Sequence, residues 1–520
     1  MNTSGGNAQG ATWTGSFDVI IVGGGGTGLA AAVEASKRGG SVVVLEKTST
    51  LGGTTALAIG SISAAGTSLQ RSRRIEDSPE KHLEDMARIA SDLKLKDNAV
   101  LRKFVAGEAA KTLDWLGDLG ISFHGPIPDA HSRAPRMHIV VPSMKACIER
   151  LEKAASRNGC RVMLNHEVKE LVQDDRGRVT GVVSFDRARQ KLERFRARQG
   201  VILASGDYSS SSEVKRKFLP EDIAEIDGIN ENATGDGYRL GIRVGADALA
   251  MDQVYGPEFR FIPNLKGTFR DRFPSHPFLG KMMAVALDIL PRGILARFAK
   301  ELLVSWQHPE DAIFKKGAIL VNSSGQRFTD ETTTPSREIA VAKQHNKIAY
   351  LVLDQTIALQ FSRWPNFVST APFIAYAYLD DYKRFRPDIF SQVFSWQDAS
   401  KRISCNSDIL QKTLADYNAA VELKVKDPWG RHVFGSPLAT PPFYVLGPLK
   451  AYIPTTQGGL RVNQSLQVLR ASGDVIQGLY AGGTTGQGGL VHYSHGMGLA
   501  WAFTSGRLAG MNAATAEAVD

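Results

Sequence analysis

The chain has 520 residues, which is long enough for several structural units and excludes a single small module. Hydrophobic residues make up 43% and charged residues 22%, and this globular balance excludes wholesale disorder and a fibrous protein. The net charge is +9 with scattered basic residues, so anionic ligands are weakly favoured and nucleic acid binding is not expected.

The cysteine content and the N-terminal sequence indicate a cytoplasmic protein. Three cysteines far apart in the chain do not form a disulfide framework, and a reducing compartment is expected. Residues 1–15 lack the basic and apolar regions of an export signal and are expected to be a flexible N-terminus. No uncharged apolar run is long enough to cross a membrane. The segment 278–303 is apolar but interrupted by charges, which leaves open a cap helix, a membrane-surface contact or the mouth of a ligand channel.

The first elements predicted in the chain form a βαβ unit. Residues 17–22 are a short β-branched apolar run that predicts a strand. A glycine-rich turn follows, then an alanine-rich helix over 29–38 and a second strand over 41–46. Strand, tight turn, helix and strand within about 30 residues are typical of a Rossmann-like nucleotide-binding unit.

The glycine spacing in that turn indicates dinucleotide binding. Gly23 can make the turn, Gly25 can let the backbone approach a pyrophosphate, and Gly28 can let the helix pack on the strand. The phosphate would then meet the helix N-terminus. Glu46 ends the second strand, where a carboxylate can accept hydrogen bonds from ribose hydroxyls. The same turn contributes Gly26 and Thr27 as further candidate cofactor-binding residues.

After Glu46, the Gly/Thr-rich loop 47–56 carries Gly52-Gly53-Thr54-Thr55. Here the chain resembles the FAD-dependent fumarate reductase/3-ketosteroid dehydrogenase superfamily, whose members have a Gly-Gly-x-(Ser/Thr) loop under the flavin. The resemblance recurs at 204–207, 232–237, 478–483 and 506–510. It implies FAD, and the threonines in place of a flavin-linking histidine imply noncovalent binding. The cofactor-binding residues implied are also Lys47, Gly52, Gly53, Thr54, Thr55, Val168, Ala204, Ser205, Gly206, Asp236, Gly483, Gly498, Leu499 and Ala500.

The expected fold class is α/β, with a Rossmann-like FAD-binding domain and an inserted α+β domain that caps the substrate. The cofactor-binding pattern occupies 16–250 and resumes at 441–520, so 251–440 is the expected cap. Within the cap, strands are predicted at 317–322 and 350–354. The stretch from 78 to 119 is helical in pattern.

The substrate side departs from the fumarate reductase branch, in which two His and two Arg side chains clamp carboxylates and one Arg donates the proton. The segments 252–257, 454–459 and 494–498 stand where that branch carries three of its anchors, and they lack the anchoring His and Arg. Arg327 matches a turn of the family and is expected to be structural. Arg337 lies near, but not in, the position of the proton-donating Arg.

The segment 492–496 resembles the ketosteroid dehydrogenase branch. Tyr493 and Gly496 fall on a Tyr and a Gly whose O–H and N–H bind a 3-oxo group. Such neutral donors suit a ketone oxygen and stabilise enolate character. Tyr493 itself, Tyr255, His492 and His495 are the candidates for handling the proton.

The predicted function is an FAD-dependent dehydrogenase that introduces an α,β double bond into a cyclic ketone, either a 3-oxosteroid or a smaller oxocyclohexane. The alternative is a reductase of an enoate or enone with Arg337 as proton donor, and a flavin-bearing sensor without turnover is a third hypothesis. The substrate is a small molecule, and the electron acceptor would be a separate carrier, a quinone or oxygen. No metal site is expected, because no His or Cys cluster has ligand spacing.

Overall fold

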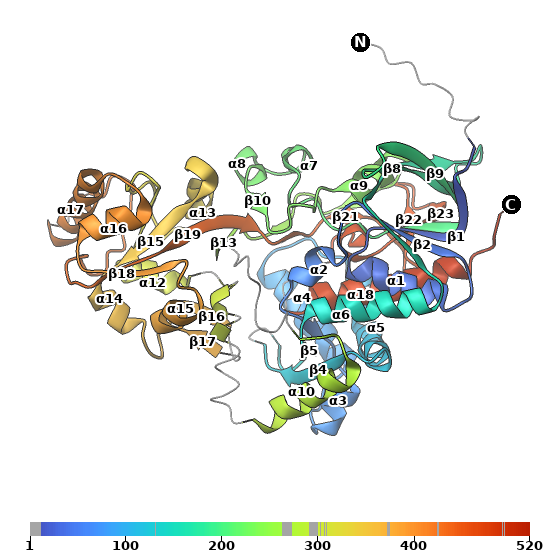
Figure 1. Ribbon diagram of the computed structural model, residues 1–520, viewed down its shortest axis with the longest axis horizontal. Coiled ribbons are helices and arrows are strands. Elements are labelled where there is room, and N and C mark those ends of the chain that lie inside the picture. The colour runs from blue at the N-terminus through green and yellow to red at the C-terminus, as the bar shows by residue number, and fades with distance from the viewer. Residues whose placement is uncertain are drawn as a thin grey trace, which may run out of the picture.

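The computed structural model describes residues 12–519, except 130–131, 263–272, 291–299, 302, 306, 308, 372–374, 424–425, 491 and 493–494. The described residues form two separate hydrophobic cores. One core belongs to a nucleotide-binding unit and the other to a second unit, which lies to the left in Figure 1. The mixed α/β class predicted from the sequence is confirmed.

The predicted βαβ unit is present as β1 (Gly15–Val22), α1 (Gly26–Ser36) and β2 (Val42–Glu46). Strand β1 pairs in parallel with β2 and with β9 (Lys191–Leu203), at the centre of a sheet of order β22-β23-β9-β1-β2-β6. A strand that is buried on both faces has a continuous apolar sequence, which explains the sequences of β1 and β2. The other strands are β6 (Arg161–Leu164), β7 (His166–Gln173), β8 (Val179–Asp186), β22 (Gln467–Leu469) and β23 (Val475–Ala481).

Helices cover one face of this sheet. Figure 1 shows α1, α18 (Met497–Ala514) and α6 (Met144–Arg157) below the strands. Helices α1 and α18 approach closely, because a Cβ atom added at Gly506 would lie 2.3 Å from the Thr27 carbonyl oxygen. Small residues therefore fix α18 against the glycine-rich start of α1.

A helical layer with a small sheet is inserted between β2 and β6. The sheet has the order β3-β5-β4, formed by β3 (Ser61–Ser63), β4 (Ser122–Ile127) and β5 (Met137–Val141). The helical stretch predicted at 78–119 is confirmed, as two helices that begin at the side-chain caps Ser78 and Asn98. The helices of this layer are α2 (Gly53–Leu57), α3 (Ser68–Ser72), α4 (Pro79–Asp92) and α5 (Ala99–Asp118).

The second unit is built on a six-stranded sheet of order β10-β19-β15-β14, with β13 and β18 also paired to β19. The two strands predicted from the sequence are β14 and β15. The strands are β10 (Asp227–Gly228), β13 (Glu258–Phe261), β14 (Ile319–Val321), β15 (Ala349–Leu353), β18 (Phe390–Val393) and β19 (Phe443–Ile453). The helices are α12 (Asp311–Lys315), α13 (Ser336–Ala342), α14 (Gln355–Gln360), α15 (Leu379–Phe385), α16 (Trp396–Ile403) and α17 (Ser407–Leu423).

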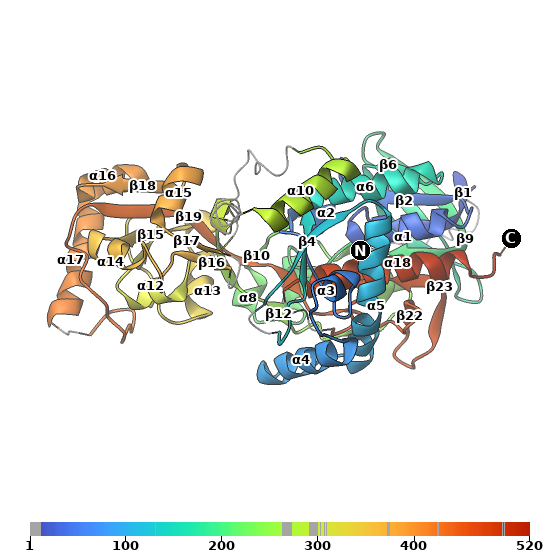
Figure 2. The ribbon, with the colours of Figure 1, turned by 90° about the horizontal axis from the view of Figure 1, so that it is seen from below.

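Two elements join the other unit from the one that the expected limits of the inserted unit assign to them. Strand β19 falls in the expected range 441–520, but it lies in the middle of the second sheet because four strands pair with it. Helix α10 (Pro277–Ile289) falls inside the expected cap, but it packs on β4 and β5 of the first unit. Figures 1 and 2 both place α10 beside that unit.

The chain crosses between the units along two paired segments. Strand β12 (Val254–Tyr255) leads out and pairs antiparallel with β20 (Thr455–Thr456), which leads back. No helix of the described residues has the length and hydropathy needed to cross a membrane. The remaining elements are α7 (Ser212–Arg216), α8 (Glu221–Ala224), α9 (Asp236–Arg243), β11 (Ala248–Leu249), β16 (Ser369–Ala371), β17 (Ala375–Ala377), β21 (Gly459–Leu460), and the 3₁₀ turns η3 (His345–Lys347) and η4 (Gly483–Gly486).

Candidate active site

A cavity of about 800 Å³ opens at the carboxyl ends of β1, β2 and β9 and extends to the crossing between the units. In open α/β sheets this edge is where ligands bind. Most of the cofactor-binding residues expected from the sequence line the cavity, which brings together segments far apart in the chain. They are Gly23, Gly25, Gly26, Thr27, Glu46, Lys47, Gly53, Thr54, Thr55, Val168, Ala204, Ser205, Gly206, Asp236, Gly498 and Leu499.

Four expected cofactor residues lie just behind this lining. A Cβ atom added at Gly28 would lie 1.9 Å from the Gly23 carbonyl oxygen, so this glycine lets α1 pack against the turn. Gly52 donates its N–H to the Gly24 carbonyl, at 2.9 Å. Gly483 abuts Thr27, and Ala500 is buried within α18. They shape the cavity wall by packing.

The start of α1 is open to the cavity. Its N-cap is Gly25, with no side-chain cap, and a Cβ atom there would meet nothing closer than 3.8 Å. A Cβ atom at Gly206 would meet nothing within 4 Å. Backbone N–H groups at a helix N-terminus attract anions. The glycines therefore leave a cradle that fits the pyrophosphate of a dinucleotide.

Two charged residues at the end of β2 brace this cradle. The Glu46 carboxylate accepts hydrogen bonds from the Gly24 N–H at 2.7 Å and from the Thr48 N–H at 2.9 Å. Lys47 lies 2.6 Å from the Asp236 carboxylate. Burial raises the pKa of Asp236, but Lys47, together with Arg239 and Thr234, more than offsets this, and the pKa lies below its usual range. The Lys47 charge is thus neutralised within the site.

A second helix N-terminus meets the cavity at Gly496. Gly496 caps α18 with φ +89, and a Cβ atom there would lie 2.7 Å from the Ser63 backbone nitrogen. The left-handed conformation and this close approach both require glycine. Helix α18 carries no side-chain cap, so its positive end is available to a ligand in the cavity.

The imidazole of His492 lies in the cavity near the start of α18. Both ring nitrogens are buried, and neither has a hydrogen-bond partner among the described residues. Burial lowers the pKa of His492 to about 3, so the ring is neutral at physiological pH. Buried polar atoms are normally hydrogen-bonded, so this ring is suited to a bound ligand.

His495 has the opposite electrostatic environment. Its Nδ1 atom lies 2.9 Å from Oδ1 of Asp129, a buried carboxylate in the connection between β4 and β5. The hydrogen bond to Asp129 raises the pKa of His495. The side chain is 52% exposed, and it lines the cavity. Asp129 was not predicted from the sequence, because no motif surrounds it.

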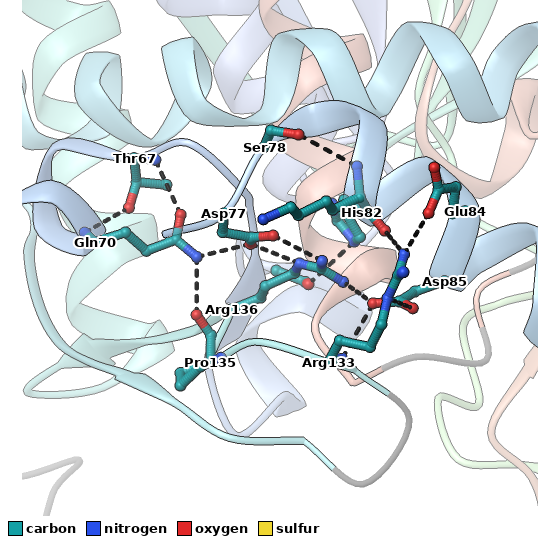
Figure 3. A network of polar contacts seen from close by, with 12 residues as sticks. Thr67, Gln70, Asp77, Ser78, His82, Glu84, Asp85, Arg133, Pro135 and Arg136 are labelled. Atoms are coloured by element: carbon teal, nitrogen blue, oxygen red, sulfur yellow. Dashed lines mark hydrogen bonds and ion pairs between the residues drawn. The ribbon is translucent and has the colours of Figure 1, made fainter. Parts of the chain in front are cut away.

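Figure 3 shows an ion network centred on the buried Arg136, which lies in the same connection between β4 and β5 as Asp129. Arg136 is fully buried, with its guanidinium 2.7 Å from Asp77 and 2.6 Å from Asp85. Arg133 also contacts Asp85, at 2.7 Å. Both arginines belong to the segment that follows Asp129, and Asp85 belongs to α4. Helix α4 thus anchors the segment that presents Asp129 to His495.

The second unit contributes the remaining wall of the cavity. Tyr255 lines it from β12, and Glu258 and Arg260 line it from β13, with Gln307 nearby. Arg260 lies 2.5 Å from Glu258. Every lysine and arginine that the structure describes in the lining is therefore paired with a carboxylate.

Arg337 and Arg327 lie outside the cavity lining. Arg337 is buried at the start of α13, where Nε lies 2.7 Å from Glu338 and the guanidinium also contacts Asp311. Arg327 lies between Glu331 and Asp427, as expected for a structural residue. Tyr493 lies outside the described residues. The three described residues of the segment 492–496, which are His492, His495 and Gly496, all line the cavity.

The sequence predicted no metal site, but the described residues bring His166, Asp186 and Glu193 together, with ligand atoms within 4.8 Å of one another. The His166 ring already has polar neighbours on both sides. Nε2 lies 3.2 Å from Glu193 and Nδ1 lies 2.8 Å from the Leu164 carbonyl oxygen. We therefore interpret this cluster as a group of side chains that bond to one another and to the backbone.

A family model described as "FAD binding domain" matches residues 18–256 and 289–499. The chain belongs to this family. It is an FAD-dependent oxidoreductase, and the cofactor predicted from the sequence is confirmed. Bound FAD is consistent with the open cradle at Gly25 and Gly206.

Among known relatives, a probable fumarate reductase of Shewanella frigidimarina is 26% identical over 95% of this chain and 74% of its own. A urocanate reductase of Eggerthella lenta is 27% identical over 96% and 75%. The open conformation of a flavocytochrome c3 fumarate reductase has the same fold, with a TM-score of 0.72 and 24% identity over 98% of this chain and 79% of that one. A 3-ketosteroid-Δ4-(5α)-dehydrogenase of Rhodococcus jostii, solved with 4-androstene-3,17-dione, gives a TM-score of 0.59 and 24% identity over 98% and 99%.

Proposed function

We propose that this flavoprotein introduces an α,β double bond into a neutral cyclic ketone, either a 3-oxosteroid or a smaller oxocyclohexane. The observation that carries the proposal is the contrast between His492 and His495, which lie three residues apart at one cavity. Burial keeps the first neutral, and Asp129 favours the charged form of the second. Two titratable groups whose pKa values are driven apart suit two different roles in one reaction.

The pairing of charges in the cavity supports a neutral substrate. Lys47 is paired with Asp236, Arg260 with Glu258, and His495 with Asp129. A dicarboxylate would need cations that are free to bind it. Among the described lining residues, each lysine and arginine already has its carboxylate, whereas the unpaired His492 ring can donate to a carbonyl oxygen without a charge.

In the proposed reaction, a proton leaves the carbon next to the carbonyl and a hydride leaves the next carbon. The neutral His492 ring and the open N-terminus of α18 stabilise negative charge that develops on the carbonyl oxygen. His495, in its neutral form, takes the proton, and Asp129 stabilises the imidazolium that results. FAD supplies the hydride acceptor.

Tyr493 and Tyr255 keep supporting roles in this proposal. The resemblance assigns the Tyr493 hydroxyl and the Gly496 N–H to the ketone oxygen, and Gly496 lies at the cavity. Tyr255 lines the cavity at the crossing between the units, where it can contact the substrate. FAD binding is proposed to be noncovalent, with Thr54 and Thr55 in the cavity lining.

A second candidate function is the reverse chemistry, reduction of an enoate or enone. The names of the fumarate and urocanate reductases among the relatives favour it. Because Arg337 lies in the second core, the proton in this direction would come from the imidazolium of His495. Electrons would be exchanged with a separate carrier, a quinone or oxygen.

The test is anaerobic bleaching of the flavin spectrum by a saturated 3-oxosteroid, an oxocyclohexane and succinate in parallel. Rapid bleaching by one of the ketones, and not by succinate, is the expected result. The reduced enzyme is then offered the matching enone, fumarate and urocanate. Inertness to both ketones, with reoxidation by fumarate or urocanate, would overturn the ketone proposal and favour the second candidate.

A further inference from the structure

Helix α10 displays a stripe of exposed apolar side chains. Phe278, Met282, Val285 and Ile289 are 67%, 53%, 51% and 77% exposed. Their spacing of four, three and four residues places them on one face of the helix. Isolated exposed apolar residues are ordinary, but a contiguous apolar stripe on a soluble surface marks an interaction site.

The opposite face of α10 fixes the helix to the nucleotide-binding unit. Gly280 is buried, and a Cβ atom there would lie 3.2 Å from Ser122 Oγ and 3.4 Å from the Val141 carbonyl oxygen. At the other end, Asp288 lies 2.7 Å from Arg73 and 2.9 Å from His124. The helix is therefore held at both ends with its apolar stripe turned outward.

Basic residues accompany the stripe. Lys281 is exposed within α10. The end of α3 carries Arg71, Arg73 and Arg74, all exposed, and Arg73 joins it to α10 and neutralises the helix's own acidic residue, Asp288. Figure 1 places α3 and α10 together at the lower end of the molecule. The chain as a whole carries a net charge of +9.

We propose that α10 docks on an anionic lipid surface. Its four outward side chains would enter the boundary between headgroups and acyl chains, and Lys281 with the arginines of α3 would face the negative headgroups. An amphipathic helix with a cationic border binds lipid in this way, through apolar burial together with charge attraction.

The size of the stripe favours lipid over a second copy of the chain. A helix of 13 residues is about 20 Å long, and the stripe is one side chain wide. A stable protein interface buries about 800 Å² on each partner, which one such stripe does not provide. Lipid imposes no such minimum area, because acyl chains close around each side chain.

The experiment is co-sedimentation of the flavin-loaded protein with vesicles of phosphatidylcholine containing phosphatidylserine, and with phosphatidylcholine vesicles alone. Binding to the anionic vesicles is expected, with at least a tenfold lower bound fraction for the Met282→Gln/Ile289→Gln variant. The Phe394→Gln/Leu423→Gln variant is the matched control, because these side chains are 72% and 71% exposed elsewhere, and it should bind as the unmodified protein does.

The charge contribution is tested separately. An Arg71→Gln/Arg74→Gln variant should bind several-fold less, whereas Lys401→Gln/Lys412→Gln, two lysines 77% exposed in the second unit, should not. Flavin absorbance and the thermal midpoint establish that each variant is folded. Absence of vesicle binding, or equal binding by all variants, would overturn the proposal. So would a concentration-dependent dimer that the α10 substitutions dissociate without any vesicle binding.

Discussion

The Nδ1 atom of His495 lies 2.9 Å from Oδ1 of Asp129, which joins the start of α18 to the connection between β4 and β5. The carboxylate is buried, while the imidazole reaches the cavity. This arrangement orients the ring and leaves its other nitrogen for the substrate. The proposed chemistry depends on this pair, so most of the predictions concern it.

Substitution of the proton carrier should slow the chemical step. For His495→Gln, the rate of flavin reduction by the active ketone is expected to fall by about 10²- to 10⁴-fold, the usual contribution of a general base. Flavin content should be unchanged. His345→Gln, at an exposed histidine, is the control and should react normally. A His495→Gln rate within threefold of the unmodified enzyme would remove this residue from the mechanism.

The carboxylate partner should set the pH range of activity. Asp129 raises the pKa of His495, so dehydrogenation, which needs the neutral ring, should rise with pH through that pKa. In Asp129→Asn the raising charge is gone, and the midpoint of this rise should move to lower pH. The measurement is the rate of flavin reduction across pH 5 to 9. An unchanged midpoint would show that Asp129 does not act through His495.

Substitution of His492 should lower the rate of flavin reduction without moving the midpoint of its pH profile. Burial lowers its pKa to about 3, so it contributes no titration near neutrality. In His492→Phe the hydrogen-bonding ring is lost, and the rate of flavin reduction should fall by about 10- to 10³-fold, as on removing one donor to a developing oxyanion. The midpoint of the pH profile should stay in place. A shifted midpoint at full rate would contradict the assignment.

The cradle at the start of α1 predicts the behaviour of a Gly25 variant. Gly25 has φ −77, which any residue adopts, and a side chain there would project into open cavity. Gly25→Val should fold with normal circular dichroism but retain less than about a tenth of its FAD, because the phosphate cradle is filled. Gly107→Ala, in α5 with nothing within 4 Å of its Cβ position, should keep full flavin. Full flavin content in Gly25→Val would contradict the proposed cofactor position.

Arg337 is expected to stabilise the second unit and to take no part in proton transfer. Its guanidinium is buried against Glu338, so Arg337→Met should cost about 3–5 kcal/mol of unfolding free energy by leaving that carboxylate without its partner. Activity for each folded, flavin-loaded molecule should stay within about twofold, because no described contact joins Arg337 to the cavity. A hundredfold loss of enoate reduction at unchanged stability would instead restore Arg337 as proton donor.

The parts predicted well from the sequence depend on neighbours in the chain. The strand, glycine turn and helix from 17 to 38 follow from the spacing of residues close together in the chain. The place of Gly25 in the turn could therefore be predicted without any long-range contact. Asp129 and His495 meet across more than 360 residues, so their pairing is a property of the fold. The limit of the inserted unit expected from the sequence lies before β19, because the sequence of an apolar strand does not show which sheet the strand joins.

The most direct measurement is stopped-flow reduction of the flavin by the active ketone, and reoxidation by the matching enone, each followed across pH in the unmodified enzyme and in His495→Gln. One group that carries the proton in both directions must give opposite profiles. Reduction should rise with pH, reoxidation should fall with pH about the same midpoint, and both should become flat in His495→Gln. Profiles that keep their shape in the variant would contradict the account.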